Sequence, residues 1–144
     1  MNAVRPLAAA RPSGSLRAML ERHDIVPTSQ RLVIAGVLFE RDQHLTAEQV
    51  LAELRAKGQR VSKATVYNTL NLFAAKGLIR PLNFDPTRCS FDSNMTPHFH
   101  LFSVDSGEIL DIAPEDIQFT RLPKLPADME LLGMEVVLRV RRKS

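Results

Sequence analysis

The sequence predicts an α+β fold, in which a helical N-terminal domain ending in a β-hairpin precedes a small α/β domain with a three-stranded, antiparallel-type sheet. Capped amphipathic segments fill residues 15–77, two short extended runs flank a turn at residues 85–87, and the pattern changes to strands beyond Asn94. We therefore expect a flexible arm over residues 1–14, one domain over 15–93 and a second over 94–144.

The composition is that of a folded globular protein. Of the 144 residues, 44% are hydrophobic and 24% are charged, which excludes the disordered and fibrous classes. No apolar run approaches the ~20 residues of a membrane span, and Arg and Pro interrupt the N-terminal segment, so we expect a cytoplasmic protein without a membrane partner. The single cysteine, Cys89, excludes an internal disulfide and a structural zinc site made of four cysteines.

Charge is divided unequally along the chain. Residues 1–80 contain 12 Lys and Arg against 6 Asp and Glu, whereas residues 81–144 contain 7 against 10. One interpretation is that the N-terminal half binds a polyanion while the C-terminal half binds cations or a partner subunit; chance scatter of surface charge is the other.

Four helices are predicted, over residues 15–23, 28–41, 46–58 and 62–77. Each has a start signal, namely the N-caps Ser15, Thr28 and Ser62 and the capping box of Thr46 with Gln49. Gly58 and Gly77 end the last two helices, because glycine adopts the left-handed conformation at little cost.

The helices and the hairpin that follows them, over residues 78–84 and 88–92, predict a winged helix. The polar face of the fourth helix carries groups that can reach base edges or phosphates: Lys63, Thr65, Tyr67, Asn68 and Asn71. Contact with double-stranded DNA is one interpretation of this face, and an ordinary solvated helix surface is the other.

The second domain is predicted to contain strands over residues 98–104, 108–113 and 134–142, joined by a Pro-rich segment. A three-stranded sheet buries little apolar surface alone. We therefore expect a homodimer, in which a second subunit covers the apolar face of the sheet.

Two histidines define a candidate metal site. His98 and His100 leave the same face of a strand, with Cβ atoms roughly 6 to 7 Å apart. A two-residue hairpin loop would place Asp111 on that face, opposite Phe102, whereas a three-residue loop would place it on the other face. Asp92 could supply another oxygen, and nothing local makes His44 a ligand. Histidines with ordinary hydrogen bonds are the alternative.

Four motifs in order resemble the ferric uptake regulator family of dimeric winged-helix repressors. They are Pro27-Thr28-Ser29-Gln30-Arg31, His44-Leu45-Thr46-Ala47-Glu48, Ala64-Thr65-Val66-Tyr67-Asn68-Thr69-Leu70 and His98-Phe99-His100. Details at residues 67–71, 91–94 and 136–141 look closest to the iron response regulator subgroup. The resemblance covers nearly the whole chain beyond the arm.

The resemblance implies one metal site at the hinge between the domains. Its ligand positions are occupied here by His44, Asp92, His98, His100 and Asp111. Imidazoles and carboxylates together suit Fe(II), Mn(II) or Zn(II) and do not choose among them. The resemblance also implies haem as a regulatory ligand of His98 or His100, because haem iron needs only one or two axial ligands.

Several residues depart from the family pattern. Ser103 and Ser106 replace the first zinc-binding cysteine pair, and a second dimerisation-domain site is lost at Pro97, Phe99 and Gln118. Phe99 also replaces the middle member of the subgroup's triple histidine, and no Cys-Pro haem motif is present. Val26 stands where many relatives carry a basic residue that enters the minor groove, a contact for which Arg31, Arg5 and Arg11 could compensate.

The function that the resemblance implies is a dimeric, sequence-specific transcriptional regulator of iron and haem homeostasis. It would bind an AT-rich inverted repeat under low iron, through Arg31, Lys63, Thr65, Tyr67 and Asn68, and haem would release it. The alternative is a conventional repressor activated by Fe(II) or Mn(II). A small metalloenzyme and an interaction module that does not bind DNA are the rivals from other classes.

Overall fold

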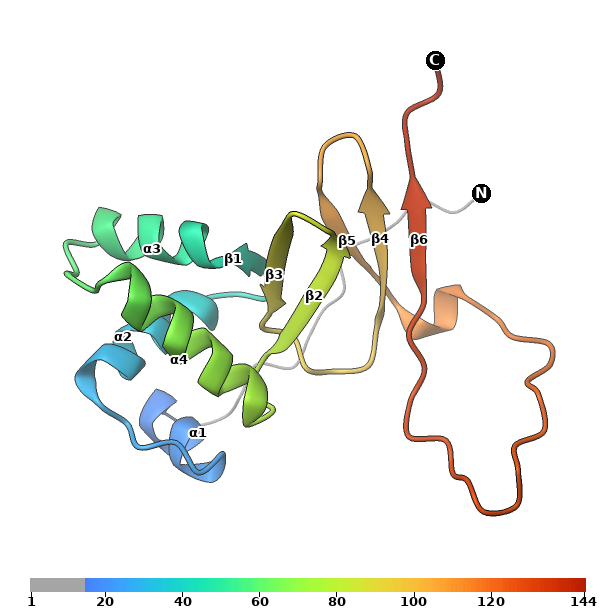
Figure 1. Cartoon of the computed structure of the whole chain (residues 1–144), viewed down its shortest axis with the longest axis horizontal. Helices are drawn as coiled ribbons and strands as arrows, with labels where there is room; N and C mark the ends of the chain where they lie inside the picture. Colours follow the sequence, from blue (N-terminus) through green and yellow to red (C-terminus); the bar gives the residue numbers. More distant parts are fainter. Residues whose placement is uncertain (1–14) are drawn as a thin grey trace. The chain divides into compact units, whose positions relative to one another are not determined.

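A computed structural model describes residues 15–144, which form two compact units that divide between Thr96 and Pro97 (Figure 1). The arm predicted over residues 1–14 lies outside the described residues. The N-terminal unit contains α1 (Leu16–Arg22), α2 (Ser29–Leu38), β1 (His44–Thr46), α3 (Ala47–Ala56), α4 (Lys63–Ala75), β2 (Arg80–Asp85) and β3 (Arg88–Asp92). The C-terminal unit contains β4 (Phe99–Ser103), β5 (Ile109–Ile112), the 3₁₀ turn η1 (Pro114–Asp116) and β6 (Val137–Val140).

The predicted caps begin all four helices. The side chains of Ser15, Thr28 and Ser62 each accept a hydrogen bond from the backbone three residues on. Thr46 and Gln49 make both hydrogen bonds of the predicted capping box. Helix α2 is shorter than predicted and ends at Leu38, because the Gln43 side chain caps the carbonyls of Val37 and Leu38.

The core of the N-terminal unit lies among the helices. Its fully buried side chains come from every helix, and they include Leu20, Ile34, Leu38, Val50, Leu54, Val66, Leu70 and Phe73. Burial of this face of α4 turns the opposite face, which carries Lys63, Tyr67 and Asn68, toward solvent. The core therefore fixes which side chains of α4 remain available for a partner.

The hairpin predicted after α4 forms as β2 and β3, and a third strand joins it (Figure 1). Strand β1, which was not predicted, pairs antiparallel with β3 and gives the order β1-β3-β2. In this register His44 is the neighbour of Asp92 and Thr46 is the neighbour of Ser90. The three residues of β1 carry only a short pattern, so periodicity could not identify the strand.

The second sheet has the order β5-β4-β6 and is mixed rather than antiparallel. Strand β4 pairs antiparallel with β5 but parallel with β6. A parallel pairing requires a long connection, and residues 113–136 supply one, so the expectation of an antiparallel last strand was wrong. Strand β6 is also shorter than the predicted strand over residues 134–142.

The register of the β4–β5 hairpin differs from the prediction. Phe102 pairs with Ile109, so the loop is longer than the two-residue and three-residue loops considered, and the backbone of Gly107 donates to the carbonyl of Ser103 within it. Asp111 pairs with His100 instead of Phe102. Because the shift from the two-residue alternative is an even number of residues, Asp111 lies on the face of His100, as that alternative implied.

The described helices include none with both the length and the hydropathy of a membrane span.

Candidate metal centre and nucleic-acid face

In the C-terminal unit, three predicted ligands converge on one face of the sheet. His100 lies in β4 beside Asp111 of β5, and His98 precedes β4 by one residue. The Nε2 atoms of His98 and His100 are 3.0 Å apart, and they lie 3.3 and 3.6 Å from Asp111 Oδ1. Both histidines are buried and Asp111 is half-buried.

These distances suit a small cation. Adjacent ligands of an ion bound at ~2.1 Å lie about 3.0 to 3.4 Å apart, the longer value for a tetrahedron. The separations of 3.0 to 3.6 Å among the three atoms are close to that range. Two imidazoles and a carboxylate are ligands that Fe(II), Mn(II) and Zn(II) accept. The residues therefore fit a divalent metal.

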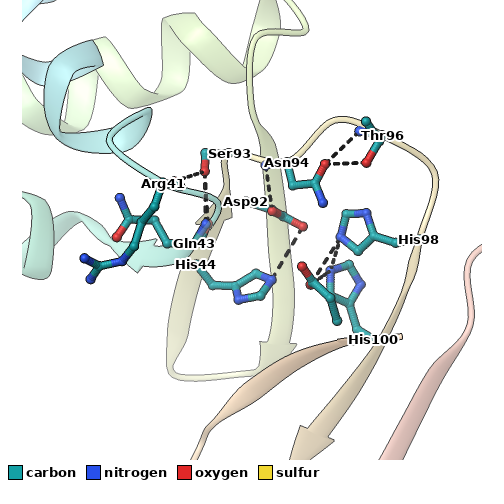
Figure 2. Close-up of polar contacts among 10 residues, drawn as sticks. Arg41, Gln43, His44, Asp92, Ser93, Asn94, Thr96, His98 and His100 are labelled. Carbon is teal, nitrogen blue, oxygen red and sulfur yellow. Dashed lines mark hydrogen bonds and ion pairs between the residues drawn. The ribbon is translucent and has the colours of Figure 1, made fainter. Parts of the chain in front are cut away.

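In the N-terminal unit, His44 and Asp92 form a pair. His44 of β1 lies across from Asp92 at the end of β3, and its Nε2 atom is 3.6 Å from Asp92 Oδ2 (Figure 2). The Asp92 side chain is fully buried, and its Oδ1 atom accepts a hydrogen bond from the backbone of Asn94 at 2.9 Å. A buried carboxylate needs such partners, because its transfer from water is costly. The pairing depends on β1, which explains why local reasoning gave His44 no role.

The structure also shows polar residues beside this pair that the sequence did not indicate. Ser93 exchanges hydrogen bonds with the segment that leads into His44, and the carboxamide oxygen of Asn94 accepts from the amide and hydroxyl of Thr96 (Figure 2). The Nδ2 atom of Asn94 is buried without a hydrogen-bond partner among the described residues. This donor would need a hydrogen-bond acceptor from outside the described residues.

The predicted nucleic-acid residues lie on the solvent side of α4 and on the first turn of α2. Lys63, Tyr67 and Asn68 are exposed, and Thr65 is half-buried. A groove lined by Thr28, Ser29, Gln30, Arg31, Thr65, Asn68, Thr69 and Leu72 joins the two helices. Arg31 also donates to the carbonyl of Val26 at 3.0 Å. The structure thus brings Arg31 to the same groove as Thr65 and Asn68.

A neighbouring groove is lined in part by Tyr67 and by Glu48, a residue to which the sequence pattern gave no role. The Tyr67 hydroxyl donates to the carboxylate of Glu48 in the first turn of α3, and Lys63 Nζ lies 5.8 Å from the centre of the tyrosine ring. This hydrogen bond lowers the pKa of Glu48 and raises the pKa of Tyr67. No signal in the sequence could have found the contact, because it joins residues on different helices.

Sequence comparison with known proteins identifies relatives of this chain. A sequence model of the Ferric uptake regulator family matches residues 23–136. The chain is 32% identical over 129 residues to the Ferric uptake regulation protein of Pseudomonas aeruginosa, covering 87% of this chain and 96% of that one. It is 31% identical over 94 residues to the Peroxide-responsive repressor PerR of Staphylococcus epidermidis, covering 65% of this chain and 63% of that relative.

The fold is also similar to a solved structure. The structure of the Ferric uptake regulator from P. aeruginosa with manganese superposes with a TM-score of 0.70 at 28% identity, covering 89% of this chain and 98% of that one. The likeness extends over both units of the chain.

Proposed function

This chain belongs to the ferric uptake regulator family, and we propose that it is a metal-responsive, DNA-binding transcriptional regulator. Regulators of this family bind DNA as dimers and are not enzymes. The observation that carries the metal-responsive part is the convergence of His98, His100 and Asp111 at separations that suit one divalent ion. Its partner would be chromosomal DNA, so we place the protein in the cytoplasm.

The proposed metal site has five ligands, as the family resemblance implies. His98, His100 and Asp111 would hold the ion, and His44 and Asp92 are the further ligands that the resemblance implies. Each of the five residues offers one ligand atom of the required type. A bound ion supplies positive charge that stabilises the carboxylates of Asp92 and Asp111. Metal can raise DNA affinity only if it binds the DNA-binding conformation better than the others.

Activation by metal is better supported than release by haem. The relatives named above are ferric uptake and peroxide-responsive proteins, and one was solved with manganese. The Nε2 atoms of His98 and His100 lie 3.0 Å apart and within 3.6 Å of Asp111 Oδ1, a grouping that suits one divalent ion. The haem response and the iron response subgroup predicted from the sequence have no support of this kind.

DNA binding is proposed for the exposed face of α4 and the first turn of α2. Tyr67 would meet thymine methyl groups, while Lys63, Thr65, Asn68 and Arg31 would contact phosphates or base edges. We propose that α4 enters the major groove of an AT-rich inverted repeat. The basic balance of residues 1–80, with 12 Lys and Arg against 6 Asp and Glu, suits this partner.

A homodimer is proposed for the C-terminal unit. Residues 119–140 expose many apolar side chains, namely Phe119, Leu122, Leu125, Met129, Leu131, Leu132, Met134, Leu138 and Val140. Monomers rarely expose so many apolar residues in one segment, so this segment is a suitable interface for a second copy. The two-fold symmetry of such a dimer would match the inverted repeat.

A DNA-binding titration tests the proposal. Metal-stripped protein is titrated onto an AT-rich inverted repeat, alone, with Mn(II) and with haem, at one salt concentration. We expect tight, sequence-selective binding only with Mn(II). Tight binding without metal that haem abolishes would overturn the metal-activated function in favour of haem release. Equal, weak binding under all conditions would argue against regulation at this site.

A further inference from the structure

Two polar side chains connect the His44–Asp92 pair to a helix of the DNA-binding face. Ser93 follows Asp92, and Gln43 precedes His44. The backbone of Ser93 donates to Gln43 O at 3.1 Å, and the backbone of Gln43 donates to Ser93 Oγ at 3.2 Å. The Ser93 hydroxyl in turn donates to the carbonyl of Arg41 at 3.2 Å (Figure 2). These bonds hold together the two segments that carry the proposed ligands.

The Gln43 side chain extends this connection to α2. Its Nε2 atom donates to Val37 O at 2.8 Å and to Leu38 O at 3.3 Å. These carbonyls belong to the last turn of α2, where a helix has no internal donors left. The Gln43 side chain therefore links the segment before His44 directly to the C-terminal end of α2.

The other end of α2 lies at the proposed DNA face. Residues 28–31 line the groove that they share with Thr65 and Asn68 of α4. A helix of 10 residues is about 15 Å long. Arg31 and Leu38 therefore belong to one hydrogen-bonded helix, with no loop between them.

We propose that Gln43 and Ser93 are positioning residues that couple metal at His44 and Asp92 to the orientation of α2, and so to Arg31 on DNA. The inference rests on the proposed function and adds a route for regulation that lies within the N-terminal unit. Metal would fix strand β1 relative to β3. The hydrogen bonds of Ser93 would then restrict the position of Gln43, and the side-chain amide of Gln43 would hold the C-terminal end of α2.

A purely structural role predicts a different result. If Gln43 only stabilised α2, its loss would lower folding stability and weaken DNA binding equally with and without metal. Coupling instead predicts a selective loss of the gain in DNA affinity that metal causes. The reason is that linkage concerns the difference in DNA affinity between the metal-free and the metal-bound protein. The ratio of DNA affinities with and without Mn(II) is therefore the informative measurement.

The experiment uses the full chain with four variants. Gln43→Met keeps the length of the side chain and removes its donors, whereas Gln59→Met is the matched control at an exposed glutamine. Ser93→Ala removes the hydroxyl, and Ser93→Thr restores it. For each protein we would measure thermal unfolding, the Kd for Mn(II), and the Kd for the inverted repeat with and without Mn(II).

We expect Mn(II) to raise the DNA affinity of the wild type and of Gln59→Met by about 10-fold or more, within the usual range of allosteric coupling. In Gln43→Met this gain should fall below about 3-fold, while the Kd for Mn(II) changes little. Ser93→Ala should lose the gain and also bind Mn(II) about 10-fold more weakly, because outer residues orient ligands. Ser93→Thr, which has a hydroxyl, should show both the metal-induced gain in DNA affinity and the wild-type Kd for Mn(II).

The failures are distinguishable. A wild type without any metal-induced gain overturns the proposed function together with this coupling. A full gain in both Gln43→Met and Ser93→Ala overturns the coupling alone. If Gln43→Met does not fold, Ser93→Ala decides, since it leaves the Gln43 cap of α2 in place: a retained gain refutes the coupling, and a lost gain that threonine restores supports it.

Discussion

The Tyr67 hydroxyl donates a hydrogen bond to the Glu48 carboxylate, which ties the exposed face of α4 to the first turn of α3. The ring is thereby held in one orientation on the surface that we propose for base contact. A tyrosine held in place loses less side-chain entropy on binding than a free one. Glu48 is thus expected to act on DNA recognition through Tyr67.

Removal of the Tyr67 ring should reduce sequence-specific DNA binding. We expect Tyr67→Ala to weaken binding to the inverted repeat by about 10-fold, because a base contact contributes roughly 1–3 kcal/mol. Binding to random DNA, Mn(II) affinity and thermal stability should change little. Tyr67→Phe, which keeps the ring and removes the hydroxyl, should fall between the wild type and Tyr67→Ala. Equal losses on specific and random DNA would contradict base recognition by this side chain.

The Tyr67–Glu48 contact should be insensitive to pH near neutrality. The hydrogen bond lowers the pKa of Glu48 below its ordinary value of 4.5 and raises the pKa of Tyr67 above 10.0. A carboxylate with a lowered pKa contributes its contact above the ordinary value, and loses it as the pH falls through the lowered one.

The difference in DNA affinity between the wild type and Glu48→Ala should therefore be constant from about pH 5.5 to 9. Binding titrations at fixed salt would measure it, and Glu48→Gln, which keeps an acceptor, is the control. A step near pH 7 that is present in the wild type and absent from Glu48→Ala would show that this contact titrates, against the expectation.

Loss of the two histidines should separate metal response from folding. We expect His98→Ala with His100→Ala to abolish the Mn(II)-induced gain in DNA affinity, while weak binding without metal persists. The reason is that these atoms, with Asp111, are the group that suits the ion. Isothermal titration with Mn(II) and DNA binding would measure the two effects. A double variant that still responds fully to Mn(II) would place the sensing site elsewhere.

The sequence predicted those parts of the fold that depend on local patterns. Caps such as Ser62 and the Thr46–Gln49 box signal helix starts through contacts three residues apart, and the structure has them. The predicted end of α2, at residue 41, was wrong because the cap of this helix comes from Gln43, beyond the helix. The predicted antiparallel direction of β6 was wrong because no local sequence pattern in either strand encodes their pairing across a long connection.

The candidate sites divide in the same way. His98 and His100 are two residues apart, so a local pattern could select them. His44 needed the family resemblance, because its neighbour Asp92 lies on another strand. Ser93, Gln43 and Glu48 could not be selected at all, since their contacts join elements distant in the sequence.

The core of the N-terminal unit should be sensitive to truncation on the buried side of α4. Leu70 is fully buried in this core, so Leu70→Ala should lower the free energy of unfolding by about 2–5 kcal/mol. Asn71→Ala, at the adjacent exposed position, should change it by less than about 0.5 kcal/mol. Urea unfolding followed by circular dichroism would measure both. Similar losses of unfolding free energy in the two variants would contradict this orientation of α4.

Arg31 should contribute to DNA affinity mainly through charge. It lies in the groove between α2 and α4 and donates to the Val26 carbonyl, which holds its guanidinium at the proposed DNA face. We expect Arg31→Ala to weaken binding to specific and random DNA alike. The slope of log affinity against log salt should become shallower by about 1, because one phosphate contact releases roughly one counterion.

Arg31→Lys is the matched control, since it keeps the charge but has fewer donors for the Val26 carbonyl. We expect it to retain the salt slope and to lose only part of the affinity. If Arg31→Ala weakened binding to the inverted repeat alone, with an unchanged slope, Arg31 would recognise a base instead of a phosphate. The first turn of α2 would then contribute to sequence selection, and the metal-dependent orientation of that helix would alter specificity as well as affinity.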